Sequence, residues 1–348
     1  MISQKLIRKH KNGEEEMQNI KMTTKMRPFT LEDAEEVVDL FNAHSQYLHG
    51  WDDCDLEEMI NEWTSPGLDL NEVVRVIEDT DGKIIGYVEI WDTSQPHVIK
   101  YSWALLHPEA WDDALYREML TWAEDCARSR IALAPQGARV TMSQGTNSKD
   151  HQRVAALEAY GYRLVRNFYR MMIEFDQAPP KPALPEGIVI VPIDIQKELK
   201  EAILAADEGF RDHWGYVERP IDEMLEQWQH HIANSNNFDP SLWFLAKEGD
   251  QIAGICYCAG KMTEDPEMAW VNQLAVRKPW RRRGLGMALL LHAFGEFYRR
   301  GKKRAGLGVD ATSLTNATRL YEKAGMHVVE TYNTYEFELR PGIEMKKT

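Results

Sequence analysis

Cysteine is scarce in this sequence, and its spacing excludes two common uses. The 348 residues contain only Cys54, Cys126, Cys256 and Cys258, which do not form the paired spacing of a zinc site. Cys256 and Cys258 lie two residues apart in a strand-like run, so both side chains should lie on one face of a sheet. We therefore expect no metal, buried free thiols rather than disulfides, and a reducing compartment.

Long apolar runs and an excess of positive charge are also missing. No run of 18 apolar residues occurs, so we expect no membrane-spanning helix and no membrane partner. Residues 1–26 lack the apolar centre of a signal peptide, which predicts a flexible arm and a cytoplasmic protein. The net charge of −14 argues against a nucleic-acid partner, because nucleic acids bind basic surfaces. Such acidity favours solubility, and it can also attract a cationic amine.

Proline is concentrated at one place, which divides the chain. Residues 177–185 contain four prolines in nine positions, and these cannot continue a helix or a central strand. We predict a linker at 177–187 between a first domain at 27–176 and a second domain at 188–342. Two domains also agree with a length of 348 residues, at about 100–200 residues per domain.

The two halves repeat the same order of elements, which indicates a duplication. Each half is expected to contain a helix, a tryptophan-containing segment, a second helix and a hairpin. Each then continues as strand, long helix, strand, helix and strand, which predicts two tandem α/β domains with mixed sheets. The expected helices are 31–43 and 56–63 in the first half and 196–206 and 221–232 in the second. The hairpins are 73–88 and 242–257, in which Gly86 and Gly254 are equivalent.

The loop at residues 277–286, between a predicted strand at 269–276 and a predicted helix, carries the clearest chemical signal. Gly284 and Gly286 allow the backbone to approach a ligand closely. Consecutive amides at a helix N-terminus bind anions, and the arginines at 281–283 add positive charge. A pyrophosphate is therefore expected, although the loop matches neither the P-loop nor the dinucleotide pattern. The helix is expected to bury Met287, Leu290, Leu291, Phe294 and Tyr298.

Two motifs in this half resemble those of the GNAT acetyltransferase superfamily. Residues 281–286, Arg-Arg-Arg-Gly-Leu-Gly, resemble the family's Arg/Gln-x-x-Gly-x-Gly/Ala signature. Residues 316–326 resemble its Asn-x-x-Ala-x-x-x-Tyr-x-x-x-Gly-Phe run, with small departures. The resemblance implies that the second half is an acetyl-CoA-dependent N-acetyltransferase domain.

The resemblance also implies how the cofactor is held. The backbone amides of residues 282–287 would bind its pyrophosphate, and the strand edge at 274–276 would bind its pantetheine arm. Tyr321 would protonate the leaving thiolate, because attack on a thioester needs the departing sulfur to be stabilised. The cofactor-binding candidates are Leu274, Ala275, Val276, Arg281, Arg282, Arg283, Gly284, Leu285, Gly286, Met287 and Asn316.

The group that deprotonates the amine is less well defined. Glu208 lies where the substrate-side helices of the family meet, and Asp310 is expected near the end of the strand after the long helix. Further candidates are His213, Glu267 and Glu336. Each is also explained as a solvated group or a helix cap. Many members of the superfamily deprotonate the amine through water, so no single base is required.

The first half aligns with the second as a degenerate copy. Its substitutions oppose pyrophosphate binding, because side chains block the backbone and carboxylates repel phosphates. We therefore expect acetyl-CoA to bind only the second half, which the first half braces. This tandem arrangement resembles that of the mycothiol synthases and their relatives. Trp111, Asp112 and Asp113 replace residues 281–283, Ala114 and Tyr116 replace Gly284 and Gly286, and Leu157 and Gln152 replace Tyr321 and Asn316.

These observations predict an N-acetyltransferase, that is, an acyltransferase, that moves acetyl from acetyl-CoA to a primary amine of a small molecule. Direct attack in a ternary complex is the expected route. A non-catalytic acyl-CoA-binding or regulatory module is the first alternative, and Tyr321 argues against it because a pure binder does not need an acid. A peptide or protein N-acetyltransferase is the second alternative. The acceptor and the oligomeric state stay open.

Overall fold

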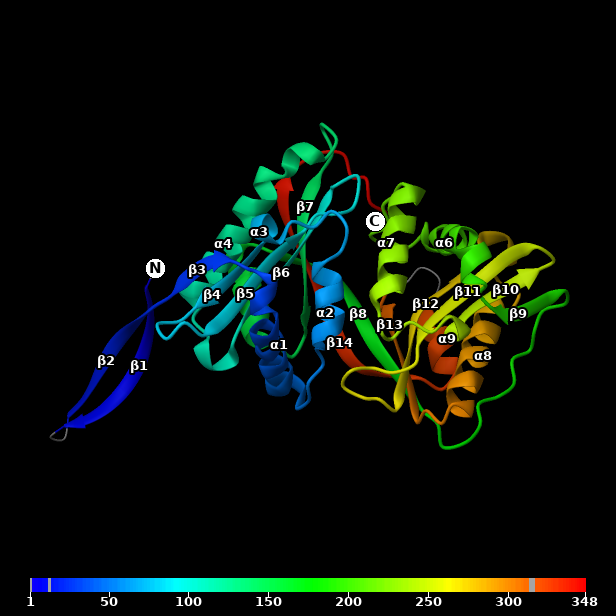
Figure 1. Ribbon diagram of the computed structural model, residues 1–348, viewed down its shortest axis with the longest axis horizontal. Helices are drawn as coiled ribbons and strands as arrows, with labels where there is room; N and C mark the ends of the chain where they lie inside the picture. The colour runs from blue at the N-terminus through cyan, green and yellow to red at the C-terminus, as the bar shows by residue number, and fades with distance from the viewer. Residues whose placement is uncertain (1, 12–13, 313–316) are drawn as a thin grey trace.

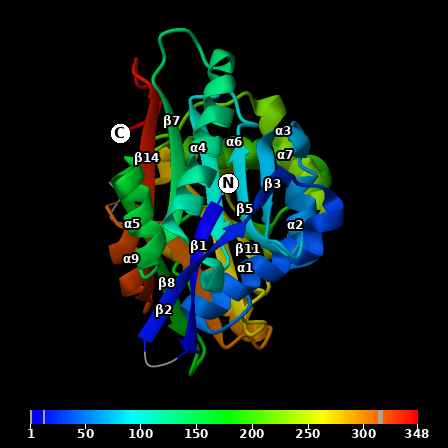
Figure 2. The ribbon, with the colours of Figure 1, turned by 90° about the vertical axis from the view of Figure 1, so that its left-hand side faces the viewer.

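One long mixed sheet runs through the protein, and helices cover both of its faces (Figure 1). The computed structural model describes residues 2–11, 14–312 and 317–348. In the described residues the sheet has twelve strands in the order β3-β4-β5-β6-β7-β14-β8-β13-β12-β11-β10-β9. Helices α1, α2 and α7 lie on one face, and α4, α5 and α9 lie on the other (Figure 2).

The predicted order of elements is confirmed in both halves. The first half contains β3 (Lys25–Pro28), α1 (Ala34–His49), α2 (Leu56–Trp63), α3 (Leu70–Val73), β4 (Val74–Glu78), β5 (Ile84–Trp91), β6 (Ile99–Leu106), α4 (Asp113–Ser129), β7 (Val140–Asn147), α5 (His151–Tyr160) and β8 (Arg163–Glu174). The second half contains β9 (Ile188–Pro192), α6 (Ile195–Phe210), α7 (Ile221–Asn234), β10 (Trp243–Glu248), β11 (Gln251–Ala259), β12 (Met268–Val276), α8 (Leu285–Arg299), β13 (Arg304–Asp310), α9 (Ala317–Lys323) and β14 (His327–Arg340).

Strand register supports the alignment of the two halves. Gly86 lies opposite Leu106, and Gly254 lies opposite Val276. Both glycines are needed for close packing. A Cβ at Gly86 would lie 2.8 Å from a side-chain carbon of Leu106, and one at Gly254 would lie 2.8 Å from the carbonyl oxygen of Ala275. The duplication is therefore visible in packing as well as in element order.

The N-terminal segment, for which the sequence predicts a flexible arm, contains a hairpin. β1 (Ile2–Lys11) pairs with β2 (Glu14–Thr23) as an antiparallel hairpin, and Lys25 already begins β3 of the large sheet. The sequence does contain a signal for this pairing. Asn-Gly at positions 12–13 is the dipeptide that most strongly favours a two-residue hairpin connection.

The last strand of each half lies in the sheet beside strands of the other half. β8 pairs with β13 of the second half, and β14 pairs with β7 of the first half. β8 and β14 also pair with each other at the centre of the sheet. The linker therefore separates the halves along the chain but not in space, because each half completes the other.

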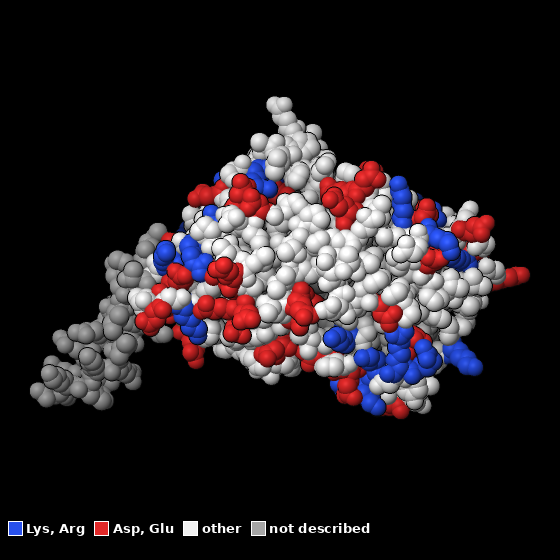
Figure 3. Space-filling view, viewed as in Figure 1, with Lys and Arg blue, Asp and Glu red and all other residues white. Residues whose placement is uncertain are grey.

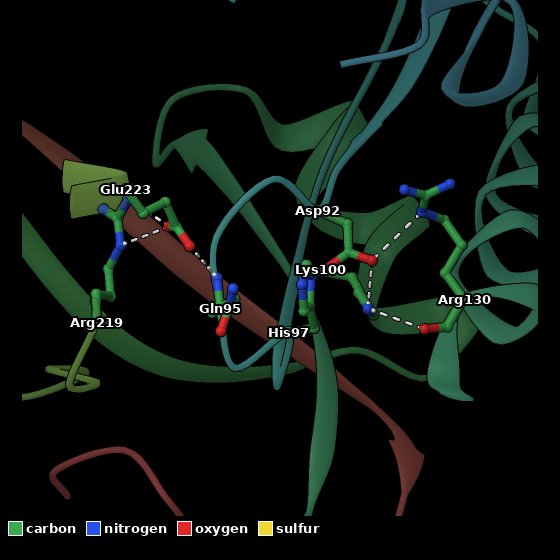
Figure 4. A network of polar contacts seen from close by, with 7 residues as sticks. All are labelled: Asp92, Gln95, His97, Lys100, Arg130, Arg219 and Glu223. Carbon is green, nitrogen blue, oxygen red and sulfur yellow. Dashed lines mark hydrogen bonds and ion pairs between the residues drawn. The ribbon is translucent and has the colours of Figure 1, made fainter. Parts of the chain in front are cut away.

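Side chains also join the halves, as Figure 4 shows. Asp92, at the end of β5, is buried and pairs with the fully buried Lys100 and with Arg130 (Nε–Oδ2 3.3 Å). Burial lowers the pKa of Lys100, whereas Asp92 opposes that shift. The loop that follows Asp92 carries Gln95, whose backbone N–H donates to Glu223 of α7 at 3.2 Å. The loop after β5 in the first half thus contacts a helix of the second half.

Helix α8 buries a different stripe from the one predicted. Leu290 and Phe294 are buried as expected, but Tyr298 is 40% exposed and Leu289 is fully buried instead. Apolar residues occupy positions 287–291 without a break, so their spacing alone does not fix which side faces the sheet. The prediction of a core helix is right, and its orientation is wrong by about one position.

The remaining sequence expectations concern the thiols and the surface. Cys256 and Cys258 are buried free thiols on one face of β11, with their sulfur atoms 3.7 Å apart, as predicted. None of the described helices combines the length and apolar composition that crossing a membrane requires. On the face shown in Figure 3, acidic side chains lie over both halves, with basic ones among them.

Candidate active site

A cavity of about 730 Å³ opens where two neighbouring strands of the second half separate. β12 and β13 pair in parallel only from Met268–Arg304 to Val271–Leu307, and both strands then continue apart. A bulge at Asn272, which the register with β11 skips, coincides with the separation. Bulges bend a strand and redirect its backbone groups. The cavity contains most of the predicted cofactor residues: Leu274, Ala275, Val276, Arg281, Arg282, Gly284, Leu285, Gly286 and Met287.

The start of α8 has the geometry of an anion site. Gly284 is its N-cap with φ 84°, a left-handed conformation that glycine adopts without strain. The first intrahelical bond runs from the amide of Ala288 to the carbonyl of Gly284, at 3.0 Å. The amides of residues 285–287 therefore have no carbonyl partner within the helix. Leu285, Gly286 and Met287 all line the cavity, so this start of the helix borders open space. The site fits a pyrophosphate.

The three arginines of the loop have different surroundings. Arg281 binds the carbonyls of Val276 and Gly209, both at 2.9 Å, and pairs with Asp212, so its guanidinium ties the strand end to α6. Arg283 pairs with Glu248 at 3.1 Å and does not line the cavity. Arg282 lines the cavity with φ 62°. Of the three side chains, that of Arg282 is best placed to face a phosphate.

Tyr321 lies in the same cavity, as the sequence predicts, and Asn316 lies outside the described residues. The tyrosine belongs to α9 and is only 8% exposed. Burial raises the pKa of Tyr321, and Cys256 nearby adds to that effect. Its phenol therefore stays protonated over a wider pH range than a phenol in water.

The carboxylates proposed as bases are all held in ion pairs. Glu208 faces away from the cavity and pairs with Arg277 at 2.7 Å, so its position does not suit a base. Asp310 lines the cavity but accepts two bonds from Arg166, at 2.9 and 2.7 Å. Glu267 and Glu336 lie outside the cavity, paired with Arg304 and with Lys346 respectively. Sequence spacing gave no sign of these partners.

His213 is the other base candidate that lines the cavity. It follows α6, and its ring packs edge-on against Phe210, with the centroids 4.8 Å apart. Burial lowers the pKa of His213, partly opposed by Asp212. Burial therefore favours the neutral imidazole.

Four aromatic residues that line the cavity were not among the predicted site residues: Phe168, Phe210, Trp214 and Trp280. Trp214 lies next to His213 on the loop after α6, and Phe168 comes from β8 of the first half. Trp214 stands within a tryptophan-containing segment whose site role was not recognised. Phe168 could not have been found, because its place depends on the exchange of β8 between the halves.

The corresponding region of the first half is filled by side chains. β6 and β7 also separate, after Tyr101, but Arg153 lies between them. Its guanidinium donates to the carbonyl of Gly145 at 3.3 Å and stands 4.8 Å from the ring of Trp103. Arg153 is 2% exposed. The space that corresponds to the cavity of the second half is therefore closed.

The helix start in the first half is already occupied by a carboxylate. Asp112 caps α4 by accepting the amide of Leu115 at 2.8 Å. Tyr116 is fully buried and donates its hydroxyl to the carbonyl of Ala104 at 3.1 Å. A phosphate would meet a negative charge and a blocked backbone here. In the part of the chain that the structure describes, no group of three or more His, Cys, Asp or Glu is placed to hold a metal.

Comparison with known proteins agrees with this geometry. Residues 204–326 match the model of a family described as Acetyltransferase (GNAT) family. A GCN5-related N-acetyltransferase from Sphaerobacter thermophilus has 31% sequence identity to this chain, and the match covers 93% of this chain and 98% of that one, with a TM-score of 0.76. No curated protein matches the chain.

Two more distant solved structures resemble the fold. A tandem GNAT protein from the clavulanic acid biosynthesis pathway has 15% identity over 92% of this chain and 100% of its own, with a TM-score of 0.68. Saccharomyces cerevisiae N-myristoyltransferase with bound myristoyl-CoA has 9% identity over 92% of this chain and 84% of its own, with a TM-score of 0.61. The predicted tandem architecture is thus found in a solved protein. The resemblance to the mycothiol synthases stays a prediction.

Proposed function

This chain belongs to the GCN5-related N-acetyltransferase (GNAT) family, a family of acyl-CoA-dependent acetyltransferases, and from that premise we propose its specific reaction. It transfers the acetyl group of acetyl-CoA to a primary amine of a small molecule, by direct attack in a ternary complex. The observation that carries this proposal is the convergence of two groups on one cavity. The free amides at the start of α8 and the buried phenol of Tyr321 both line it.

Backbone groups of the second half would hold the cofactor. The amides of residues 285–287 bind the pyrophosphate, and Arg282 adds a positive charge beside it. The edge of β12 beyond Val271, which β13 leaves unpaired, binds the amides of the pantetheine arm. When bound, acetyl-CoA supplies the thioester carbonyl that an amine attacks. The filled space beside Arg153 and Asp112 supports one cofactor site per chain.

Tyr321 and His213 would manage the protons. His213 lines the cavity and burial favours its neutral imidazole, so it would accept the proton that the amine nitrogen loses as it attacks the thioester, directly or through water. Tyr321 donates its proton to the departing sulfur, and its raised pKa keeps that proton in place until then. Asp310 forms an ion pair with Arg166, so we assign it a role in positioning the cavity wall rather than in accepting the proton. This assignment favours His213 over Glu208 and Asp310.

The acceptor end of the cavity supports a small molecule. Phe168, Phe210 and Trp214 surround it with aromatic rings, and His213 and Asp310 add polar groups. Few polar groups on an apolar wall are typical of small-ligand sites. An acceptor with an apolar part next to its amine would fit these walls.

The test is thiol release from acetyl-CoA by the purified full-length chain. The panel contains simple amines, amino sugars, aminoglycosides and peptides. We expect at least one non-peptide amine to be acetylated with stoichiometric thiol release. Turnover of peptides alone would favour the peptide or protein N-acetyltransferase. Tight acetyl-CoA binding without turnover of any amine would favour the non-catalytic module.

A further inference from the structure

We propose that residues 341–348 form a strap that positions the acceptor side of the cavity, with Lys346 as its central positioning residue. The strap follows β14 and runs from beside β7 in the first half to a point next to α7 in the second, as the red end of the chain in Figure 1 shows. The proposal deepens the proposed function, on which its kinetic test rests. It assigns a role in amine binding to residues that do not line the cavity.

The strap is anchored on the first half through its backbone. The amide of Ile343 donates to the carbonyl of Gly137 at 2.8 Å, and the amide of Arg139 donates to the carbonyl of Ile343 at 2.8 Å. Glu344 pairs with Arg139 at 2.9 Å. The approach at this point is very close, because a Cβ at Gly342 would lie 2.3 Å from the carbonyl oxygen of Gly137. This end of the strap is therefore fixed.

The other end of the strap binds the loop that carries His213 and Trp214. The amide of Gly215 donates to the carbonyl of Lys347 at 2.8 Å, and the amide of Lys347 donates to the carbonyl of Tyr216 at 2.9 Å. Lys347 is thus bonded through both its carbonyl and its amide to two consecutive residues of the loop. It holds the backbone immediately after the two cavity residues.

Lys346 connects the two ends. Its side chain is 5% exposed and pairs with Glu336 of β14, which Arg139 also contacts at 3.4 Å. The Lys346 Nζ stands 5.5 Å from the ring centroid of Trp214. A cation at this distance from a tryptophan ring attracts it, more strongly where water is excluded. Lys346 thus fixes the position of an aromatic ring that lines the cavity.

A second cation contacts the same ring from the first half. The Arg166 guanidinium stands 5.3 Å from the Trp214 centroid, and it also holds Asp310 in the cavity. The acceptor wall is therefore built by three separate segments: β8 of the first half, the loop after α6, and the strap. None of these contacts involves the start of α8. Loss of the strap should therefore lower kcat/KM for the amine and leave the Kd for acetyl-CoA unchanged.

The first test compares Lys346→Gln with Lys347→Gln in the full chain. Both remove one positive charge from the strap, but the Lys347 side chain is exposed and only its backbone binds the loop. For Lys346→Gln we expect kcat/KM for the amine to fall about ten- to hundredfold, as displaced positioning groups produce. The Kd for acetyl-CoA should stay within about twofold of wild type in both variants. Lys346→Arg should recover part of the loss, because it keeps the cation.

Equal amine kinetics in Lys346→Gln and Lys347→Gln would overturn the proposal. If Lys346→Gln does not fold, the double variant Glu336→Gln/Lys346→Met replaces it, because it leaves no buried charge unpaired. The double variant still lacks the cation beside Trp214, so it should show the same selective loss for the amine. Wild-type amine kinetics in the double variant would contradict the role of Lys346.

A structural readout separates this proposal from the proposed function. Hydrogen exchange of the Gly215 amide, which donates to Lys347, should be faster in Lys346→Gln than in wild type or Lys347→Gln. This measurement needs no acceptor. If no amine is ever turned over, the proposed function fails while the exchange result still decides on the strap. Unchanged protection of the Gly215 amide in Lys346→Gln would contradict the proposed role of the strap.

Discussion

Single residues distinguish the second half, which contains the cavity, from the first half, in which the corresponding space is filled by side chains. Tyr321 of α9 is replaced by Leu157 of α5 in the first half, and both are buried at equivalent places. Packing therefore tolerates either side chain, and only the hydroxyl distinguishes them. The hydroxyl of Tyr321 gives the cavity a group that can donate a proton, which Leu157 does not provide in the first half. Chemistry and stability can accordingly be separated at this position.

Replacing Tyr321 by phenylalanine tests its role as the acid. The ring stays in place, so kcat should fall roughly ten- to ten-thousandfold while the Kd for acetyl-CoA changes little. In wild type the rate should hold through about pH 10, where an unperturbed phenol ionises, because burial raises the pKa of Tyr321. Steady-state rates against pH and calorimetric titration measure both effects. A folded variant with full turnover would show that solvent, rather than Tyr321, protonates the leaving thiolate.

Glu89 of the first half provides a test of stability against pH. Tyr87 donates its hydroxyl to Glu89 at 2.5 Å, and burial raises the pKa of Glu89 to about 7. Folding therefore favours the protonated carboxyl. Its contribution to the free energy of unfolding is complete below the unfolded pKa of about 4.3 and is lost as pH rises through about 7.

Glu89→Gln should remove this dependence. Relative to wild type, the free energy of unfolding of the variant should increase between about pH 4.3 and pH 7 and then stay level. Urea unfolding at several pH values measures the difference. Glu174→Gln is the control, because Glu174 is exposed at the end of β8. A difference that does not change with pH would show that folding leaves the pKa of Glu89 unshifted.

At the scale of elements, two equivalent helix starts show how the same geometry binds or rejects an anion. α8 begins after Gly284 and its first residues line the cavity, whereas α4 begins after Asp112, whose carboxylate caps the helix. The alignment places Asp112 at Arg282, so α4 begins two residues earlier than α8. A side chain of the protein occupies in one half the place that a ligand would take in the other.

Gly284→Asp imitates the first half at the start of α8. Aspartate tolerates the left-handed conformation better than most residues and can cap a helix, so the fold should survive. Its charge should oppose the pyrophosphate, and the Kd for acetyl-CoA should rise by at least about tenfold, which corresponds to 1.4 kcal/mol. Gly284→Asn has nearly the same shape without the charge, and it should bind more tightly than the aspartate variant. Calorimetric titration of both variants makes the comparison, and equal wild-type affinity in both would show that the phosphates lie elsewhere.

Most elements could be predicted because their signals are local. The spacing of apolar residues and the turn residues predicted both hairpins and the four helices expected at 31–43, 56–63, 196–206 and 221–232. The anion loop was found for the same reason, since glycine and arginine positions are visible in the chain itself. The partners of Glu208 and Asp310 were not found, because Arg277 and Arg166 are distant in sequence. Ion pairs of this kind require the tertiary structure.

At the scale of the whole molecule, the two halves are parts of one sheet. β8 pairs with β13 and β14 pairs with β7, so each half lacks an interior strand when it is alone. Sequence order predicts two separate domains because it contains no information on which sheet a final strand joins. The exchange also has a functional effect, since β8 brings Phe168 to the cavity and Arg166 to Asp310.

Cutting the chain in its linker should therefore give two fragments that need each other. Residues 186–348 expressed alone lack β8, which leaves an edge of β13 unpaired and Asp310 without Arg166. We expect this fragment to be poorly folded and not to bind acetyl-CoA, although it contains every predicted cofactor residue. Co-expression of this fragment with residues 1–185 should restore acetyl-CoA binding. A third preparation is the full chain cleaved at an engineered protease site within 177–187. Its two fragments should stay together and unfold in one transition, because the central strands belong to both halves. Calorimetric unfolding and acetyl-CoA titration of the three preparations measure this. Full acetyl-CoA affinity in the isolated second fragment would mean that β8 can be replaced, and that the first half supports the amine site rather than the fold.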